Sequence, residues 1–330
     1  MPATIGMGNY RYEYRPDWAN LPSGMDLQAP SAVAVDSQDN LYVFQRGDPP
    51  VLVFDRDGEL VAQWQRKNGV PTDAHLVYVG PDDGVYLADR DAHQILKYTP
   101  DGELVMSLGT RDRAELQAPF NHPADMCVAP PGSPQAGDIF VADGYGNSSV
   151  HRFSASGDFI TSFGDPGSGP GEFRVPHSVR VSPDGRIYVA DRENNRVQIF
   201  SPRGEFIEEW TDFKKPMGVH IDGAGTVYVT DQVPRISILS LDGELLARAA
   251  PSSNLTTSTL TRPATSTART WRTGGCRFLE RSSLAPVWLR LKPQQVHARV
   301  NLDHLAGDEA GVFQEPNHGA GDGFRVGDGF

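Results

Sequence analysis

The first 250 residues contain a repeated pattern, and this repeat restricts the possible fold more than any other feature of the chain. Five similar segments begin at Pro30, Ala74, Pro123, Pro176 and Pro216. Each contains an apolar stretch, a turn and a second apolar stretch such as VYLAD or IYVAD. Most continue through a third stretch, such as VQIFS, and a glycine-containing turn into a fourth. Alternating β-branched and aromatic residues between turns predict strands, so each unit is expected to contain four strands.

The spacing of the repeats indicates one architecture. The residue that closes the second stretch recurs every 40 to 54 residues, at Gln45, Asp89, Asp143, Asp191 and Asp231. Four short strands at this interval are typical of a β-propeller, whereas a helical repeat would show an apolar period of about 3.6 residues. We therefore predict an all-β, six-bladed β-propeller with five clear blades, near residues 30–64, 74–109, 123–164, 176–210 and 216–249.

The sixth blade is expected to be degenerate or missing. Residues 11–18 (RYEYRPDW) precede the first repeat and are suited to add an outer strand to a last blade, which would close the ring. After residue 250 the chain has no VYVAD-like stretch and becomes rich in Ser, Thr and Arg. We divide the chain into a propeller at 1–250 and an atypical tail at 251–330, expected to be disordered or out of frame. A small divergent cap over the open edges is the alternative.

Composition limits the classes of function. The net charge of −12 divides into −14 for residues 1–250 and +2 for residues 251–330. An acidic propeller does not suit the phosphate backbone, so we expect no nucleic-acid partner. No apolar run approaches about 18 residues, and the N-terminus lacks the apolar core of a secretory signal. We therefore expect a cytoplasmic protein without a membrane partner; Cys127 and Cys276 are too few for a disulfide framework.

Aligned repeat positions face the same place around a propeller axis, so the alignment identifies candidate sites. The second residue of the opening strand is His75 in blade 2 and His177 in blade 4, and is not histidine in the other blades. In a six-bladed ring these blades are related by about 120°, which suits two ligands of a trigonal His₃ metal site. The alternative is that each histidine is only a polar residue lining a wet channel. His220 aligns with Arg180 and is not a third member.

A second aligned position lies directly after the second strand of each unit. It is occupied by Arg46, Arg90 and Arg192 in three blades, and in blade 3 by a glycine followed by Tyr145. Guanidinium groups suit carboxylate ligands, although pairing with a neighbouring Asp or Glu is the simpler explanation for any single arginine. A tyrosine acts as a general base when a nearby cation or metal lowers its pKa, but most buried tyrosines only donate a hydrogen bond.

The stretch from Gly144 to Phe200 resembles the peptidyl-α-hydroxyglycine α-amidating lyase (peptidylamidoglycolate lyase) family, a branch of the six-bladed NHL-repeat propellers. The resemblance rests on DGYGNSS, VPHS and ADREN together, and extends through QRGD at 45–48 to cover about residues 25–245. NHL repeats in general show VYVAD and RVQIF, but not the tyrosine and the two histidines at these places. The resemblance therefore predicts both an NHL-type propeller and a particular site.

The resemblance implies a carbon–nitrogen lyase that cleaves an N-acyl-α-hydroxyglycine, as a small molecule or at the C-terminus of a peptide, to an amide and glyoxylate. The family's catalytic residues fall on Arg46, Tyr145 and Arg192, and two of its three zinc ligands fall on His75 and His177. Zinc would hold the α-hydroxyl and lower its pKa, the tyrosine would take its proton, and arginine would bind the carboxylate. A structural calcium would be bound partly by the backbone carbonyls of Val33 and Val77.

The third zinc ligand is not found in the sequence. In the family it belongs to the sixth blade, but His297, His304 and His318 do not precede a VYVAD-like strand. We therefore expect the family's layout, with activity impaired by the loss of the sixth blade. One alternative is a non-catalytic NHL propeller that serves as a scaffold for proteins or peptides. Another is a calcium-dependent sugar lactonase, which would require Glu and Asn or Asp along the axis where this repeat has His and Arg.

Overall fold

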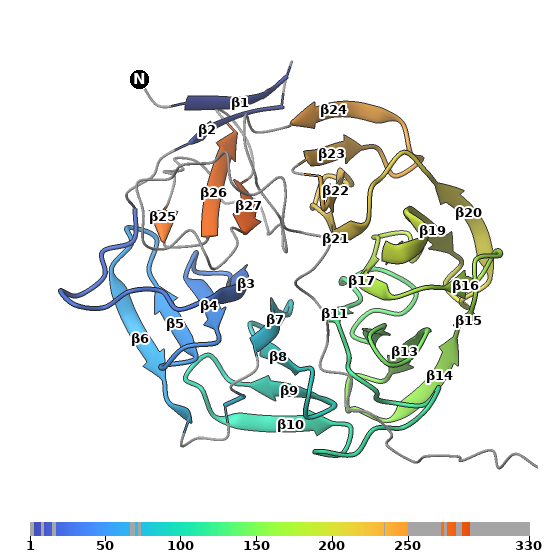
Figure 1. Ribbon diagram of the computed structural model, residues 1–330, viewed down its shortest axis with the longest axis horizontal. Coiled ribbons are helices and arrows are strands. Elements are labelled where there is room, and N and C mark those ends of the chain that lie inside the picture. Colours follow the sequence, from blue (N-terminus) through green and yellow to red (C-terminus); the bar gives the residue numbers. More distant parts are fainter. Residues whose placement is uncertain are drawn as a thin grey trace, which may run out of the picture.

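The computed structural model describes residues 3–7, 10–14, 18–66, 70–71, 74–233 and 235–249, together with three strands between residues 272 and 290. Five four-stranded antiparallel sheets surround a central axis (Figure 1). This arrangement confirms the predicted all-β propeller with five clear blades. Among the described residues, no helix has the length and hydropathy needed to cross a membrane.

Within each blade the strands follow one another in sequence from the axis to the circumference (Figure 1). Blade 1 contains β3 (Pro30–Val35), β4 (Leu41–Gln45), β5 (Val51–Phe54) and β6 (Leu60–Trp64). Blade 2 contains β7 (Ala74–Val79), β8 (Val85–Asp89), β9 (Gln94–Tyr98) and β10 (Leu104–Leu108). Blade 3 contains β11 (Asp125–Val128), β12 (Ile139–Asp143), β13 (Ser149–Phe153) and β14 (Phe159–Phe163).

The last two described blades follow the same plan. Blade 4 contains β17 (Pro176–Val181), β18 (Ile187–Asp191), β19 (Arg196–Phe200) and β20 (Phe206–Trp210). Blade 5 contains β21 (Pro216–Ile221), β22 (Val227–Asp231), β23 (Arg235–Leu239) and β24 (Leu245–Ala249). Between blades 3 and 4, β15 (Asp165–Pro166) and β16 (Glu172–Phe173) pair in parallel. The 3₁₀ helix η2 (Arg192–Asn194) follows β18.

A further sheet lies between blade 5 and blade 1 (Figure 1). In it β2 (Tyr10–Tyr14) pairs with β1 (Ala3–Met7) and with β26 (Cys276–Arg281), and β26 also pairs with β25 (Arg272–Thr273) and β27 (Pro286–Arg290). β1 contacts β24, and β27 contacts β3. An N-terminal strand thus joins a tail strand in the place of a last blade. The rest of the tail lies outside the described residues, so its expected disorder and the division at residue 250 stay predictions.

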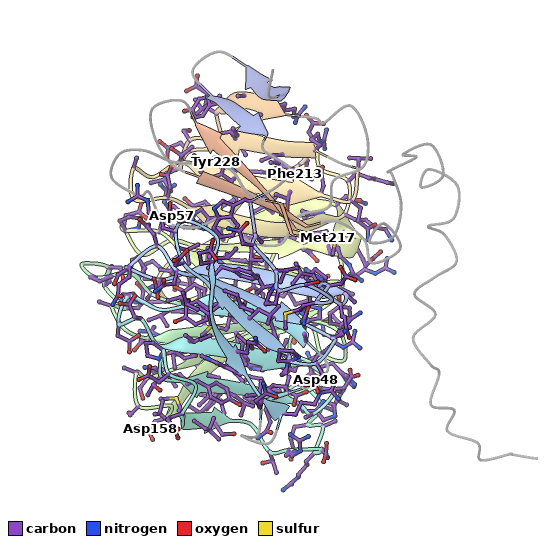
Figure 2. All side chains as sticks on the ribbon, turned by 90° about the vertical axis from the view of Figure 1, so that its left-hand side faces the viewer. Asp48, Asp57, Asp158, Phe213, Met217 and Tyr228 are labelled. Atoms are coloured by element: carbon purple, nitrogen blue, oxygen red, sulfur yellow. The ribbon has the colours of Figure 1, made fainter. Side chains whose placement is uncertain are left out.

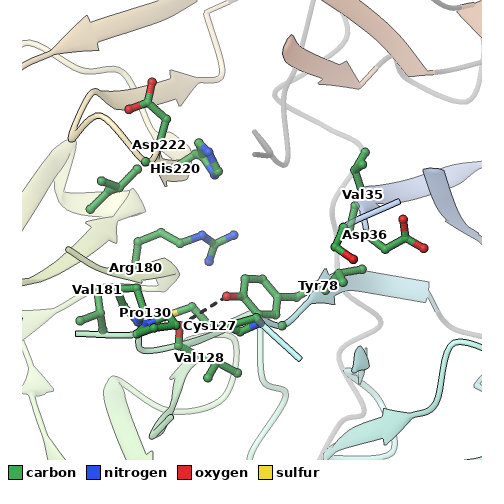
Figure 3. A pocket seen from close by; sticks show the side chains of 18 of the residues that line it. Val35, Asp36, Tyr78, Cys127, Val128, Pro130, Arg180, Val181, His220 and Asp222 are labelled. Carbon is green, nitrogen blue, oxygen red and sulfur yellow. Dashed lines mark hydrogen bonds between the residues drawn. The ribbon is translucent and has the colours of Figure 1, made fainter. Parts of the chain in front are cut away.

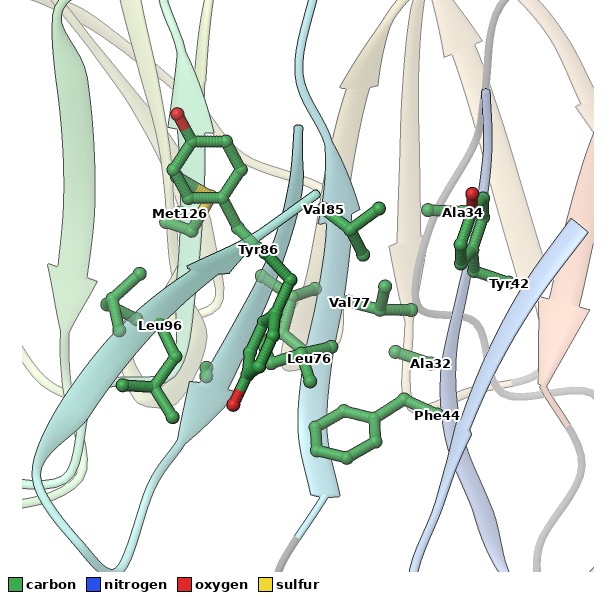
Figure 4. Packing of buried hydrophobic residues seen from close by; sticks show 14 of the residues in the cluster. Ala32, Ala34, Tyr42, Phe44, Leu76, Val77, Val85, Tyr86, Leu96 and Met126 are labelled. Atoms are coloured by element: carbon green, nitrogen blue, oxygen red, sulfur yellow. The ribbon is translucent and has the colours of Figure 1, made fainter. Parts of the chain in front are cut away.

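The hydrophobic core lies between adjacent blades rather than at the axis. Phe44 of blade 1 and Val77 and Val85 of blade 2 are fully buried in one cluster (Figure 4). Burying a side chain of this size contributes about 1.5–3 kcal/mol. Blades 3 and 4 share a second cluster, and blades 4 and 5 a third. Blade-on-blade packing therefore fixes the positions of the inner strands.

Glycine hairpins join neighbouring blades at the circumference. Gly102 and Gly243 adopt positive φ angles of 85° and 80° in the turns between the third and fourth strands. The ring of Trp64 packs on Gly102, where a Cβ atom would lie a tight 3.1 Å from the indole, and that of Trp210 packs on Gly243, where a Cβ atom would overlap the indole at 2.6 Å. In blade 3 the corresponding turn carries Asp158, which lies at the edge of the molecule (Figure 2). The glycine-containing turns thus permit both the hairpin and the contact between blades.

The residue that closes the second strand fixes the loop leading into the inner strand. In blades 1, 3, 4 and 5 its side chain accepts a hydrogen bond from the backbone N–H two residues before the repeat begins. These bonds measure 2.8–2.9 Å and join Gln45 to Gln28, Asp143 to Asn121, Asp191 to Arg174 and Asp231 to Lys214. The recurring aspartate therefore positions the start of the inner strand, where the candidate histidines lie.

Candidate active site

A β-bulge sets the position of each candidate histidine. In β7 the register passes from Ala74–Asp89 to Leu76–Ala88, so His75 is the extra residue of the ladder. His177 occupies the same place in β17, between Pro176 and Ser178. A bulge bends its strand and re-aims the side chain of the extra residue. The two imidazole rings lie with their centres 5.6 Å apart.

Each imidazole is oriented by the neighbouring blade. Nδ1 of His75 lies 2.7 Å from the carbonyl oxygen of Ala124, and Nδ1 of His177 lies 2.7 Å from that of Met217. A carbonyl oxygen only accepts hydrogen bonds, so we assign the proton of each neutral ring to Nδ1 and a lone pair to Nε2. Ala124 and Met217 are the second residues of their own repeats, so the contact between blades 2 and 3 recurs between blades 4 and 5.

Tyr145 lies between the two histidines. Its Oη is 3.1 Å from Nε2 of His75 and 3.0 Å from Nε2 of His177, and Nη1 of Arg192 donates a hydrogen bond to it at 3.3 Å. Gly144 permits this placement, because a Cβ atom at residue 144 would lie 2.1 Å from the carbonyl oxygen of Pro176. The structure therefore brings together four of the predicted residues, which we call the histidine site: His75, Tyr145, His177 and Arg192.

Two guanidinium groups flank the ring of Tyr145. Cζ of Arg192 lies 5.2 Å from the ring centre and Cζ of Arg90 lies 5.3 Å from it, within the range of cation–π interactions. Both arginine side chains are mostly buried. Arg90 is not among the predicted site residues, although it occupies the same position as Arg192 in the repeat alignment. That alignment was the signal that identifies it.

Glu193 and Lys215 hold Arg192 in place. Nε of Arg192 bonds Oε1 of Glu193 at 3.0 Å, and Nζ of Lys215 lies 2.9 Å from Oε2. Partial burial raises the pKa of the Glu193 carboxyl, but hydrogen bonds and charge from Lys215 and Arg192 outweigh it, so this pKa lies below its usual value. Glu193 therefore stays ionised at neutral pH. Its contact with Nε leaves Nη1 to donate to the hydroxyl of Tyr145.

The remaining predicted residues lie elsewhere around the axis. Arg46 follows β4, in the place that Arg90 and Arg192 have in their own blades, and its backbone N–H donates to Ala29 at 3.2 Å. Val33 and Val77 are buried in the packed parts of β3 and β7, opposite Val43 and Leu87. Their side chains belong to hydrophobic clusters. Calcium binding by their carbonyls stays a prediction.

The donor and acceptor count of the histidine site is unbalanced. With both Nδ1 protons directed to carbonyls, the two Nε2 atoms are acceptors, while Tyr145 has one hydroxyl proton and Arg192 already donates to its oxygen. One Tyr145–histidine contact therefore has no proton to share. A divalent cation bound by both Nε2 lone pairs would remove this imbalance.

The residues present fit a zinc ion. Imidazole is a common zinc ligand, and ligating histidines usually donate their second ring N–H to a carbonyl or carboxylate, as His75 and His177 do. In the part of the chain that the structure describes, no group of three His, Cys, Asp or Glu side chains is arranged to hold a metal. His297, His304 and His318 lie outside that part. Two ligands are thus in place, and a third is not assigned.

The fold and the site define a β-propeller of the NHL class. A family model described as NHL repeat matches residues 173–200. Human NHL repeat-containing protein 3 is 34% identical over 193 residues, 54% of this chain and 54% of that protein. Rat peptidylglycine alpha-amidating monooxygenase is 32% identical over 240 residues, 61% of this chain and 23% of that protein. Peptidyl-alpha-hydroxyglycine alpha-amidating lyase 1 of Drosophila melanogaster is 28% identical over 238 residues, which cover 61% of this chain and 43% of that protein.

The chain is thus an NHL-repeat propeller related to peptidyl-α-hydroxyglycine α-amidating lyases and to NHL repeat-containing protein 3, as its motifs predict. The match spans about half of the human protein and about a quarter of the rat protein.

Solved structures agree on the fold. A virginiamycin B lyase from Staphylococcus aureus superposes with a TM-score of 0.58 at 16% identity, covering 84% of this chain and all of that one. A gluconolactonase from Xanthomonas campestris superposes with a TM-score of 0.57 at 16% identity, covering 88% of this chain and 95% of that one. At such identities the likeness concerns the fold alone.

Proposed function

We propose that the protein is a peptidylamidoglycolate lyase-like enzyme, which uses zinc to cleave an N-acyl-α-hydroxyglycine into an amide and glyoxylate. The observation that carries the proposal is the contact of the Tyr145 hydroxyl with two imidazoles and one guanidinium. The similarity to proteins named as α-amidating lyases supports it. The substrate would be a small amidoglycolate or a peptide with a C-terminal α-hydroxyglycine.

Each residue of the histidine site has a part in this reaction. Arg192 binds the substrate carboxylate through the side of its guanidinium that Glu193 leaves open, and so orients the α-carbon. Oη of Tyr145, once its own proton has passed to solvent, accepts the proton of the α-hydroxyl as general base in its phenolate form. The C–O bond becomes a carbonyl, the C–N bond breaks, and the electron pair passes to nitrogen. The proton on Tyr145 then passes to that nitrogen, so the tyrosine ends as it began.

His75 and His177 would hold the zinc through Nε2. When bound, the ion would supply positive charge at the α-hydroxyl and favour its deprotonation. Arg90 and Arg192 place further positive charge beside the Tyr145 ring, which would stabilise the negative charge of its phenolate form. The carbonyls of Ala124 and Met217 fix the ring orientation that aims both lone pairs at one place.

An assay of the purified full chain tests the proposal. The protein is incubated with zinc and N-benzoyl-α-hydroxyglycine, and glyoxylate and benzamide are measured together. We expect the two products in equal amounts, at a rate that depends on zinc and on the Tyr145 hydroxyl. A folded, zinc-loaded protein that releases neither product would overturn the proposal.

A non-catalytic propeller is the second candidate. Human NHL repeat-containing protein 3, at 34% identity, matches this chain as well as the rat monooxygenase does at 32%. Under this function the axis would serve as a scaffold for a protein or peptide partner, and the histidines would bind no metal. Zinc content of the purified protein separates the two candidates, because the lyase requires about one ion per chain.

A further inference from the structure

A second site is formed at the opposite ends of the inner strands. The fifth residues of the five repeats are Ala34, Tyr78, Cys127, Arg180 and His220. All five line one cavity of 390 Å³, which we call the Arg180 cavity (Figure 3). Three residues along a strand span about 10 Å, so this cavity lies about that far along the axis from the level of the histidine site. Its volume is in the range of small-molecule sites.

Arg180 enters the cavity with part of its guanidinium unengaged. Nη1 donates to Oδ2 of Asp125 at 2.9 Å and to the carbonyl oxygen of Met126 at 3.1 Å. Among the described residues, none accepts a hydrogen bond from Nε or Nη2. The Asp125 ion pair thus holds Arg180 by one nitrogen and leaves three N–H groups for a ligand.

His220 supplies a second unsatisfied group on the next blade. Its Nε2 is buried and has no hydrogen-bond partner in the described part of the chain. Figure 3 shows its ring and the Arg180 guanidinium directed into the same space. Burial, and then the charge of Arg180, lower the pKa of His220 well below its usual value, so the ring is neutral at pH 7. A neutral ring can donate one hydrogen bond from Nε2.

The carboxylates along the cavity are already occupied. Oδ1 of Asp36 accepts two backbone N–H groups of its own turn, and Oδ2 accepts from Tyr42. Asp222 is bonded in the same way, with Tyr228 as the partner of Oδ2. Asp83 accepts from the backbone and hydroxyl of Ser37. Asp36 and Asp222 thus stabilise their own turns and Asp83 joins the turns of blades 1 and 2, so each carboxylate is engaged within the protein.

The rest of the lining is mostly apolar. Prolines and aliphatic residues surround the two polar groups, among them Pro130, Val128 and Val181. The ring of Tyr78 lies with its centre 5.5 Å from Cζ of Arg180, and its hydroxyl donates to the carbonyl of Val128. An apolar surface with a few converging N–H donors is the composition expected for a site that binds an anion with an apolar body.

We propose that the Arg180 cavity binds a small organic monocarboxylate with an apolar body. The carboxylate accepts hydrogen bonds from Nε and Nη2 of Arg180 and from Nε2 of His220, and the apolar part contacts Pro130, Val181 and Tyr78. This binding does not depend on lyase activity, because none of these residues belongs to the histidine site.

Calorimetric titration of the full chain with benzoate tests the proposal, with benzamide as the matched neutral probe. We expect benzoate to bind and benzamide to bind at least tenfold more weakly. His220→Phe, which removes one donor to a charged group, should weaken benzoate by about tenfold or more. Val79→Trp fills the cavity from a half-buried position and should abolish binding. His75→Ala, in the histidine site, should leave the affinity unchanged.

Several results would overturn the proposal. These are no benzoate binding to the folded wild type, equal affinity for benzamide, or undiminished binding to Val79→Trp. Loss of binding in His75→Ala but not in His220→Phe would instead assign benzoate to the histidine site. Near-ultraviolet circular dichroism checks the fold of each variant, and Val35→Phe fills the same cavity from blade 1 if Val79→Trp does not fold.

Discussion

The two levels of the axis differ in the ligand that their groups suit. At the histidine site, two imidazoles direct Nε2 at the Tyr145 hydroxyl, an arrangement that suits a cation. In the Arg180 cavity, Nε and Nη2 of a guanidinium and a buried imidazole nitrogen have no acceptor among the described residues, an arrangement that suits an anion. Both are built from aligned positions of the same repeat. The propeller therefore sets where groups converge, and the residues at each level set the sign of the ligand.

Backbone geometry contributes to this difference. His75 and His177 are the extra residues of β-bulges, which direct side chains away from the regular ladder. Arg180 and His220 lie in regular pairs of their strands, opposite Tyr188 and Tyr228. The side-chain positions at the first level thus depend on an irregular strand, while those at the second level follow from the twofold alternation of a regular one.

Removing the Tyr145 hydroxyl is expected to have the largest effect. Tyr145→Phe keeps the ring between the two guanidiniums but removes the group that accepts the substrate proton. A positioned general base contributes roughly 10²–10⁴-fold, so kcat for glyoxylate release should fall by about 10³-fold. Tyr78→Phe, a tyrosine of the Arg180 cavity, is the matched control and should keep kcat within about twofold. Equal losses in both variants would show that the two levels do not differ in chemistry.

Zinc binding gives the second prediction. His177→Ala removes one of two aligned imidazole ligands, so we expect at least a 100-fold loss of zinc affinity and of activity. The increase in Tm that zinc produces in the wild type should disappear, because a ligand stabilises only the state that binds it. His220→Ala is the control at the other level. Zinc content unchanged in His177→Ala would place the metal outside the histidine site.

The carboxylate anchor gives a smaller effect. Arg192→Lys keeps the charge but loses the planar fork and its bond to Glu193, so KM should rise by about tenfold, with a smaller loss in kcat. Arg186→Lys, in an ion pair with Asp184 on the turn of blade 4, is the matched control. A change in kcat alone, with KM constant, would show that Arg192 acts through Tyr145 and does not bind the substrate carboxylate.

Much of this comparison could be predicted from the sequence. Strand alternation and glycine turns predicted the blades, and the repeat alignment placed His75 and His177 at equivalent positions around one axis. DGYGNSS identified Tyr145, but the structure gives its parts separate tasks: Gly144 permits the close approach to Pro176, while Asn147 bonds the carbonyls of Glu115 and Ala118.

Other features have little or no sequence signal. A bulge depends on the register of two strands, which a single strand does not specify, so the orientation of the histidines could not be read directly. Arg90 and the pair formed by Arg180 and His220 were visible in the alignment, but their roles depend on which atoms are already bonded. Asp125, on another blade, binds only Nη1 of Arg180 and so leaves Nε and Nη2 unengaged.

The smallest expected effect concerns how the free energy of unfolding depends on pH through His220. In the folded protein the pKa of His220 lies well below 6.5, because of burial and the Arg180 charge, whereas in the unfolded chain it is about 6.5. Below that pH the unfolded state takes up a proton that the folded state does not, so His220 lowers stability as pH falls. From pH 7.5 to pH 5.5 this amounts to a loss on the order of 1 kcal/mol. Urea unfolding of the wild type and His220→Phe measures it.

The variant should lose less stability than the wild type over this range, by about that amount, since a phenyl ring takes up no proton. Val79→Trp, which alters the same cavity and keeps the imidazole, should retain the pH dependence of the wild type. If His220→Phe and the wild type lose stability equally, the folded ring takes up the proton beside Arg180. The Arg180 cavity would then hold two positive charges at acidic pH, those of Arg180 and of protonated His220. Its preference for an anion would increase as pH falls, so benzoate would bind more tightly at pH 5.5 than at pH 7.5.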